Sequence, residues 1–315
     1  MEDSLLDLLK MMAEKGEPDD QYNLAAYYES MGDQAEALKW YRKAADQGLP
    51  LAQFCVGVNY FNGDEVEQDM AEAMRWYRKA ADQGQTMAQF NLALSYELGE
   101  GVKRNMRVAI SWYRKAAELG DPKAQFSLGD CYREGKGVTK DLTEAFGWYR
   151  KAAEQGDAPA QTLVGDCYRD GLGVERNAKL AARWYRKAAE QGEAQAQFGL
   201  GSCYSEGDGL VKNAKKAFEW FRKAAEQGLP PAQFNLGNSY RLGEGVKMDK
   251  SRAVGWYRKA AEQGMAEAQC NLALCYSDGE GVERDAETFM YWLDKSAAQG
   301  FEMAATIKKE MRDKS

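Results

Sequence analysis

Eight tryptophans spaced 36 residues apart constrain the fold more than any other feature of the sequence. A constant period of about 20 to 50 residues is typical of repeat proteins, in which each repeat is a small unit that packs against the next. The phrase WYRKAA(D/E)QG surrounds the tryptophans; it is complete or nearly so in seven copies and has changed to WLDKSAAQG in the last. The series consists of Trp40, Trp76, Trp112, Trp148, Trp184, Trp220, Trp256 and Trp292.

The tryptophan phrase predicts an amphipathic helix, which we call helix B. Ala109, Trp112, Tyr113, Ala116 and Ala117 have the i, i+3, i+4, i+7, i+8 spacing of one helix face, and the Arg-Lys pair of the phrase points away from it. The rest of each period, AQFNLGxxYxxGxGVxx(D/N), predicts a second helix, helix A, and a loop. One such hairpin cannot bury its own apolar face, so the sequence predicts an all-α solenoid of eight stacked helix-turn-helix repeats.

Polar residues and glycines predict where each B helix begins and ends. Asp and Asn side chains accept hydrogen bonds from the free N–H groups at a helix start, and Glu72 and Glu144 are placed to complete capping boxes with two of them. Glycine adopts the left-handed conformation that closes a helix. The predicted caps are Asp69, Asn105, Asp141, Asn177, Asn213, Asp249 and Asp285, and the closing glycines are Gly48, Gly84, Gly120, Gly156, Gly192, Gly228, Gly264 and Gly300.

One position of helix A is always small. It holds alanine or glycine at positions 57, 93, 129, 165, 201, 237 and 273. We expect two helix backbones to approach each other closely there, because a larger side chain would keep them apart.

The two ends of the chain differ from the repeats. We predict a capping helix in residues 1–16, a shorter first hairpin in 17–48, seven repeats of 36 residues in 49–300 and a second capping helix in 301–315. The first hairpin is shorter because its turn, SMGDQ, lacks the GxGV loop.

These motifs together resemble the Sel1-like repeats, relatives of the tetratricopeptide repeats. The 36-residue period, AQFNLG, GxGV and WYRKAAEQG carry the resemblance, which covers nearly the whole chain; the first hairpin is closer to a tetratricopeptide repeat proper. The resemblance implies a right-handed superhelix whose A helices line a concave groove. It also implies a non-catalytic scaffold or adaptor that binds a peptide, helix or domain of a partner protein in that groove.

Composition disfavours several other functions. The 49 acidic and 42 basic side chains give a net charge of about −7, so we expect no nucleic acid partner. No segment approaches the ~20 apolar residues that span a bilayer, and the N-terminus lacks a secretory signal, which predicts a cytoplasmic protein without membrane insertion. The chain has no histidine, the commonest general base and metal ligand.

Features that suggest chemistry mostly recur from repeat to repeat, which favours a role in architecture. Loops such as Gly99–Val102 lack the lysine and third glycine of a phosphate-binding loop. Asp166 and Asp170 lie one turn apart but have no histidine partner and no evident substrate pocket. We therefore predict no enzyme activity and no cofactor.

Cysteines occupy one column of helix A, with one thiol per repeat. Equivalent positions in stacked helices are expected ~8–10 Å apart, which is too far for a disulfide. No histidine or second cysteine stands at metal-ligand spacing, so we predict no metal site and expect small, buried, reduced thiols. The column consists of Cys131, Cys167, Cys203 and Cys275.

The positions of helix A that vary between repeats predict the binding surface. Positions 51, 54, 58, 61 and 62 share one helix face, and by the resemblance to tetratricopeptide repeats this face lines the groove. It is apolar toward the N-terminus, charged with both signs in the middle and rich in amides beyond, which suits an amphipathic helix or extended peptide. The predicted groove residues are Leu51, Phe54, Val58, Phe61, Met87, Phe90, Leu94, Leu98, Asp130, Arg133, Asp166, Arg169, Asn235, Asn238 and Arg241.

The sequence leaves alternatives open. Neighbouring helices could cover the apolar part of the groove, namely Val58, Phe61, Leu94 and Leu98. The chain could also be a structural or self-associating array, although we predict a monomer, and helical-repeat RNA binding is opposed by the acidic charge.

Four asparagines match the residue that holds a partner's terminal carboxylate in some tetratricopeptide grooves. The lysines that accompany it there are missing from the expected positions, so we predict no carboxylate clamp. The four are Asn23, Asn91, Asn235 and Asn271.

Overall fold

The computed structural model describes residues 2–313, and these form 18 helices and no strand. The helices belong to two compact units, Met1–Gln155 and Gly156–Ser315. The predicted all-α repeat architecture is confirmed. Residues 1, 314 and 315, which the predicted capping helices include, lie outside the described residues.

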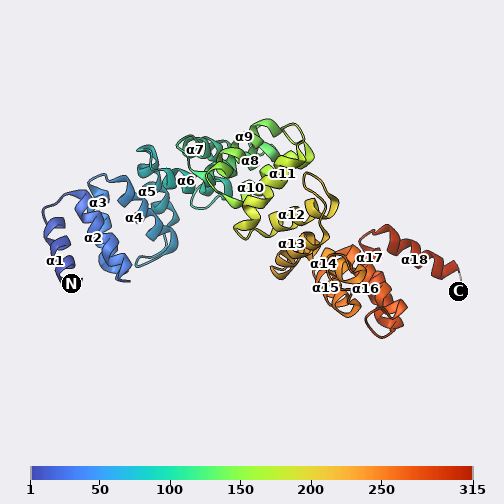
Figure 1. Cartoon of the computed structure of the whole chain (residues 1–315). Helices are drawn as coiled ribbons and strands as arrows, with labels where there is room; N and C mark the ends of the chain where they lie inside the picture. The colour runs from blue at the N-terminus through green and yellow to red at the C-terminus, as the bar shows by residue number, and fades with distance from the viewer. Residues whose placement is uncertain (1, 314–315) are drawn as a thin grey trace. The chain divides into compact units, whose positions relative to one another are not determined.

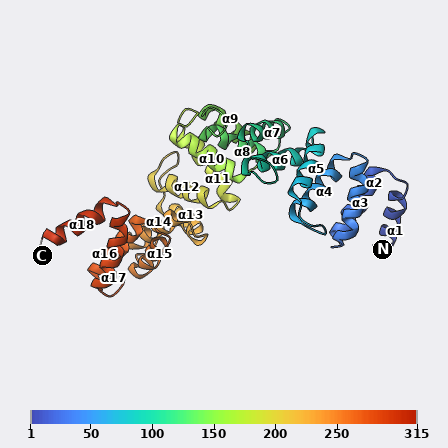
Figure 2. The ribbon, with the colours of Figure 1, turned by 180° about the vertical axis from the view of Figure 1, so that it is seen from behind.

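The first unit contains one leading helix and four helical hairpins, which follow one another in chain order in both views (Figures 1 and 2). The even-numbered helices from α2 to α16 are A helices, and the odd-numbered helices from α3 to α17 are B helices. The helices are α1 (Glu2–Ala13), α2 (Pro18–Ser30), α3 (Gln34–Asp46), α4 (Pro50–Asn62), α5 (Met70–Asp82), α6 (Thr86–Leu98), α7 (Met106–Glu118), α8 (Pro122–Glu134) and α9 (Leu142–Glu154).

The second unit repeats this plan with four more hairpins and ends on a single helix. Each A helix of this unit packs on its own B helix, and α12, α14 and α16 also pack on the B helix of the preceding repeat. The helices are α10 (Ala158–Asp170), α11 (Ala178–Glu190), α12 (Ala194–Glu206), α13 (Ala214–Glu226), α14 (Pro230–Leu242), α15 (Lys250–Glu262), α16 (Ala266–Asp278), α17 (Ala286–Ala298) and α18 (Glu302–Asp313). None of the described helices is long and apolar enough to cross a membrane.

The predicted helix boundaries are confirmed, with one correction. All seven predicted Asp and Asn caps accept a hydrogen bond from a backbone N–H of the first turn, and the closing glycines have positive φ. The predicted capping boxes are wrong in one of their two hydrogen bonds, the bond from the N–H of the capping residue to the glutamate. The Asp69 N–H donates to the Tyr60 carbonyl, so Glu72 is left to pair with Arg75 instead.

The small position of helix A packs most closely against an aromatic ring of helix B. A Cβ at Gly129, Gly165 or Gly237 would lie 2.6–2.7 Å from a ring carbon of the tyrosine on the following B helix. These tyrosines, Tyr149, Tyr185 and Tyr257, are almost completely buried. Close packing at this column is therefore confirmed: the aromatic ring is the nearest neighbour, and the backbone of helix B also lies close, since a Cβ at Gly237 would be 3.3 Å from the Ala253 carbonyl oxygen.

The Arg-Lys pair, which points away from the apolar face of helix B, makes contacts of its own in several repeats. Arg114 Nη2 donates to the Tyr132 hydroxyl of the next repeat at 2.6 Å, and equivalent bonds link Arg42 to Tyr60 and Arg78 to Tyr96. The lysine of the pair lies over the tryptophan of its own helix, with Lys115 Nζ 3.9 Å from the Trp112 ring centre. The exposed basic residues thus help to hold repeats together.

A ladder of buried glutamines ties the two helices of each repeat. The glutamine at the end of helix B donates to the side-chain oxygen of a buried glutamine on helix A at 2.8–2.9 Å. Repeat three breaks the ladder, because Leu119 stands at the position of the donor. Gln89 Oε1 is consequently buried without a hydrogen-bond partner.

We predict that Leu119→Gln stabilises the protein. Gln83, the equivalent residue one repeat earlier, reaches Gln53 Oε1 at 2.9 Å, so a glutamine introduced at position 119 should reach Gln89 Oε1 in the same way. Satisfying a buried acceptor is worth about 1–2 kcal/mol. The denaturation midpoint in urea should rise. Leu119→Asn, whose side chain is one methylene too short, is the matched control and should give no gain; an equal gain from both variants would contradict the explanation.

The GxG loop of repeat two contains a residue in an unfavourable backbone conformation. The second glycine of this loop has positive φ in the later repeats and packs on the first turn of the preceding B helix, as Gly245 does on Ala214. In repeat two the equivalent residue is Glu65, which adopts a φ of 54°. A side chain in this left-handed conformation costs about 1–2 kcal/mol.

We predict that Glu65→Gly raises the free energy of unfolding by about 0.5–1 kcal/mol, because relief of strain exceeds the added chain entropy of glycine. Chemical denaturation measures the effect. Glu65→Ala removes the carboxylate but keeps the Cβ, so it should leave stability nearly unchanged. If Glu65→Ala stabilised the protein and Glu65→Gly did not, the cost would come from the carboxylate charge, and the explanation from backbone conformation would be wrong.

Candidate functional site

Buried tyrosines of the B helices place their hydroxyl groups at the exposed face of the A helices. The tyrosine ring lies against the small residue of helix A, and its hydroxyl reaches the variable positions beyond. Tyr149 donates to Asp130 Oδ1 at 2.6 Å, and Tyr185 donates to Asp166 Oδ1 at 2.6 Å. Burial is the largest cause of the raised pKa of both tyrosines, and their bonds to the carboxylates add to it, so both hydroxyls stay protonated as donors.

Arginines complete these contacts in repeats four and five. Arg133 Nε donates to the Tyr149 hydroxyl at 3.0 Å, and its Nη2 pairs with Asp130 at 2.8 Å. Arg169 pairs with Asp166 at 3.1 Å and with Asp170 at 2.8 Å. The bond from Arg169 holds the pKa of Asp170 below its usual value. The four predicted groove residues here come together in pairs, and their charges are already compensated within the chain.

The apolar part of the predicted groove is divided between core and surface. The rings of Phe54 and Phe61 lie 5.8 and 6.3 Å from that of Tyr77. Phe90 packs on Tyr113 in the same way at 5.7 Å. These three rings are half-buried and belong to the hydrophobic core of the first unit.

The remaining apolar groove residues differ in exposure. Val58 packs on the same core and is half-buried, as is Leu94. Leu51, Met87 and Leu98 are 40, 47 and 56 % exposed and are the residues of this set most available to a partner.

Repeat six departs from its neighbours at three positions that line up with the Asp, Arg and Tyr of repeats four and five. Ser202 replaces the aspartate, Ser205 the arginine and Phe221 the tyrosine. The long side chain of the arginine and the hydroxyl of the tyrosine are therefore missing from this part of the A-helix face, and the aspartate is replaced by a shorter serine.

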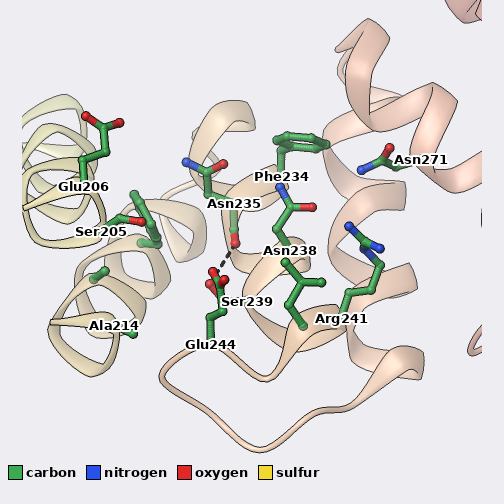
Figure 3. A pocket seen from close by; sticks show the side chains of 13 residues that line it. Ser205, Glu206, Ala214, Phe234, Asn235, Asn238, Ser239, Arg241, Glu244 and Asn271 are labelled. Carbon is green, nitrogen blue, oxygen red and sulfur yellow. Dashed lines mark hydrogen bonds between the residues drawn. The ribbon is translucent and has the colours of Figure 1, made fainter. Parts of the chain in front are cut away.

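A hollow of about 490 Å³ lies at this place in the second unit. Ser205 and Glu206 of α12, Asn235 and Asn238 of α14, and Asn271 of α16 border it, and Phe221 and Phe234 supply apolar wall (Figure 3). Arg241 lies beside Asn271 on one side, and Glu206 lies on the opposite side. Arg241 and Asn271 also border a second hollow of about 330 Å³, which Leu274 and Met303 line in part.

The three predicted groove residues of repeat seven all line the first hollow. Asn238 Oδ1 accepts the Tyr257 hydroxyl at 2.6 Å, and Arg241 Nε donates to the same hydroxyl at 3.1 Å. Asn235 borders the hollow without a direct link to this pair. Sequence reasoning did not include Ser205, Glu206, Phe221 or Glu244; the phrase WFRKAAE, in which Phe221 replaces the recurring tyrosine, is the signal that could have found them.

The thiols do not contribute to the hollow. All six cysteines are free, and the four of the predicted column are buried, as expected. Burial raises the pKa of Cys203 to about 11 and that of Cys275 to about 11, so neither is a ready nucleophile at neutral pH. Within the described residues, no group of three or more acidic or cysteine side chains is placed to hold a metal ion.

The fold and this helix face define a class of protein, namely a helical-hairpin repeat protein with a variable surface on its A helices. The Sel1 repeat matches eight times in succession, at residues 18–49, 50–85, 86–121, 122–157, 158–193, 194–229, 230–265 and 266–301. The chain belongs to the Sel1 repeat family.

Solved structures agree with this assignment. The protein c5321 of uropathogenic Escherichia coli, described as a protective antigen with an SLR fold, is 41 % identical with a TM-score of 0.88; the match covers 95 % of this chain and 65 % of that one. A Sel1 repeat protein from Oxalobacter formigenes is 32 % identical with a TM-score of 0.71, over 98 % of this chain and 91 % of that one. This chain thus spans about two thirds of the length of the Escherichia coli protein. No match was found among curated proteins.

Proposed function

We propose that this protein is a non-catalytic scaffold that binds a segment of another protein on the A-helix face. Proteins built from Sel1 and related repeats are generally scaffolds for protein interactions, and the chain belongs to that family. The observation that carries the proposal for this chain is the 490 Å³ hollow at α12, α14 and α16, where repeat six has lost the side chains that fill the same place in repeats four and five.

The composition of the hollow favours binding over catalysis. Amides, a guanidinium and carboxylates border it together with two phenyl rings, a mixture that suits recognition of a peptide backbone and its side chains. Five of the six cysteines are buried and Cys55 is half-buried, and the chain contains no histidine to move a proton near neutral pH. The free, buried thiols also favour a reducing compartment, and we propose the cytoplasm.

The first unit offers a second contact region for the same partner class. Leu51, Met87 and Leu98 are exposed apolar residues on the A helices α4 and α6. Val58 and Phe61, although predicted for the groove, pack on the core, so their substitution would disturb folding as well as binding.

Ser205→Arg is expected to abolish partner binding without unfolding the chain. The equivalent Arg133 and Arg169 occupy this place in repeats four and five, so the new side chain fits the fold but fills the hollow. Proteins retained from a lysate of the source cells on immobilised wild type and variant are compared by quantitative mass spectrometry. A specifically retained protein should be lost at least about tenfold, since one well-placed contact is worth more than 1.4 kcal/mol.

Ser111→Arg, the same substitution on the exposed surface of the B helix α7, is the matched control and should retain the partner. The triple variant Leu51→Lys/Met87→Lys/Leu98→Lys tests the first unit separately. Retention of the same partner by both groove variants would contradict binding on this face. Concentration-dependent self-association in size-exclusion chromatography, lost in either variant, would support the self-associating alternative.

A further inference from the structure

The charges around the first hollow differ from those at the equivalent positions of repeats four and five because their ion-pair partners within the chain have been replaced. Arg133 and Arg169 each pair with two carboxylates, at the positions i−3 and i+1 of the same helix. For Arg241 these positions hold Asn238 and Leu242. Among the described residues, Arg241 forms no ion pair, and its Nε donates to the neutral Tyr257 hydroxyl. On the side of the second hollow it lies near Glu280, whose pKa is lowered first by its partner Lys250 and further by Arg241.

Two glutamates at the edge of the same hollow have lost cations in the same way. Glu206 corresponds to Glu134 and Asp170, which pair with the arginine that precedes each of them, but Ser205 precedes Glu206. Glu244 corresponds to Glu280, which pairs with Lys250 at 2.8 Å, but the residue equivalent to Lys250 is Ala214. Neither glutamate forms an ion pair in the part of the chain that the structure describes.

The arrangement in space separates the two signs. Arg241 lies beside Asn271 at one side of the hollow, Glu206 lies at the other side on α12, and Glu244 lies at the lower edge in the loop after α14 (Figure 3). The Asn238 amide adds a donor at the Arg241 side, because its oxygen already accepts from Tyr257 and its nitrogen remains.

We propose that this hollow receives a partner segment that carries an acidic side chain next to a basic one. The carboxylate pairs with Arg241 and accepts from the Asn238 amide, and the cationic group lies between Glu206 and Glu244. Four substitutions in the chain, at the positions of Asn238, Leu242, Ser205 and Ala214, leave these charges available to a partner of complementary pattern. This inference rests on the proposed function, because it names the chemistry of the segment bound at the same site.

Selection from a random dodecapeptide phage library on the immobilised full chain tests the inference. Wild type should enrich peptides with Asp or Glu close to Lys or Arg. A synthetic peptide of the selected sequence should bind Arg241→Glu about 10- to 100-fold more weakly in fluorescence anisotropy, the range of a lost charge-assisted hydrogen bond. The same peptide with its acid replaced by lysine should recover binding to Arg241→Glu.

Arg169→Glu is the matched control, since Arg169 occupies the same column but is paired within the chain, and this variant should select the same peptides as wild type. Arg241→Gln repeats the test without charge reversal, and circular dichroism and urea midpoints verify that each variant folds. Enrichment without charged pairs, or equal binding to wild type and both Arg241 variants, overturns the inference and leaves the scaffold function intact. Failure of wild type to retain any peptide, by contrast, counts against the proposed function itself.

Discussion

The contact on which the A-helix face depends is the packing of a B-helix tyrosine ring against a glycine or alanine of helix A. The ring fills the space that a larger side chain would occupy, since a Cβ at Gly165 would lie only 2.6 Å from the Tyr185 ring. The same geometry fixes where the hydroxyl emerges, so the apolar core and the polar surface of each repeat have one origin. Asp130, Asp166 and Asn238 all receive that hydroxyl, each at 2.6 Å.

Because the tyrosine ring serves the core and its hydroxyl serves the surface, replacing tyrosine by phenylalanine changes the surface of one repeat and leaves its core packing intact. In repeats four, five and seven the tyrosine hydroxyl donates to the aspartate or asparagine of helix A, and in repeats four and seven it also accepts from the arginine. Phe221 keeps the ring packing against Gly201 but has no hydroxyl to donate, and Ser205 and Phe221 both border the hollow. Repeat proteins tolerate such local changes because stability is approximately a sum over repeats and their neighbours.

The repeat period, the helix caps and the closing glycines could be predicted because each is a local property of a few adjacent residues. The inner contacts were harder to predict. The small column was attributed to close backbones because the periodicity places residues on a face but does not say which side chain meets them across the interface. Likewise, Glu72 was assigned to a capping box because sequence spacing does not reveal that the Asp69 N–H already donates to Tyr60.

The candidate site was predicted in part for a similar reason. Asn235, Asn238 and Arg241 were found as variable positions of one helix, but the hollow beside them results from residues that are missing in the neighbouring repeat. The apolar residues Phe54, Phe61 and Phe90 share the variable face and yet stack on tyrosines, which helical spacing alone does not distinguish from exposure.

We propose that the A-helix face of the second unit binds a protein segment. Hydrogen–deuterium exchange of the full chain, with and without a saturating amount of a retained partner or selected peptide, is the measurement that tests this binding site. We expect added protection in α12, α14 and α16 and in the loop that contains Glu244, with little change in the B helices α11 and α17. Protection confined to B helices, or to the first unit, would contradict it.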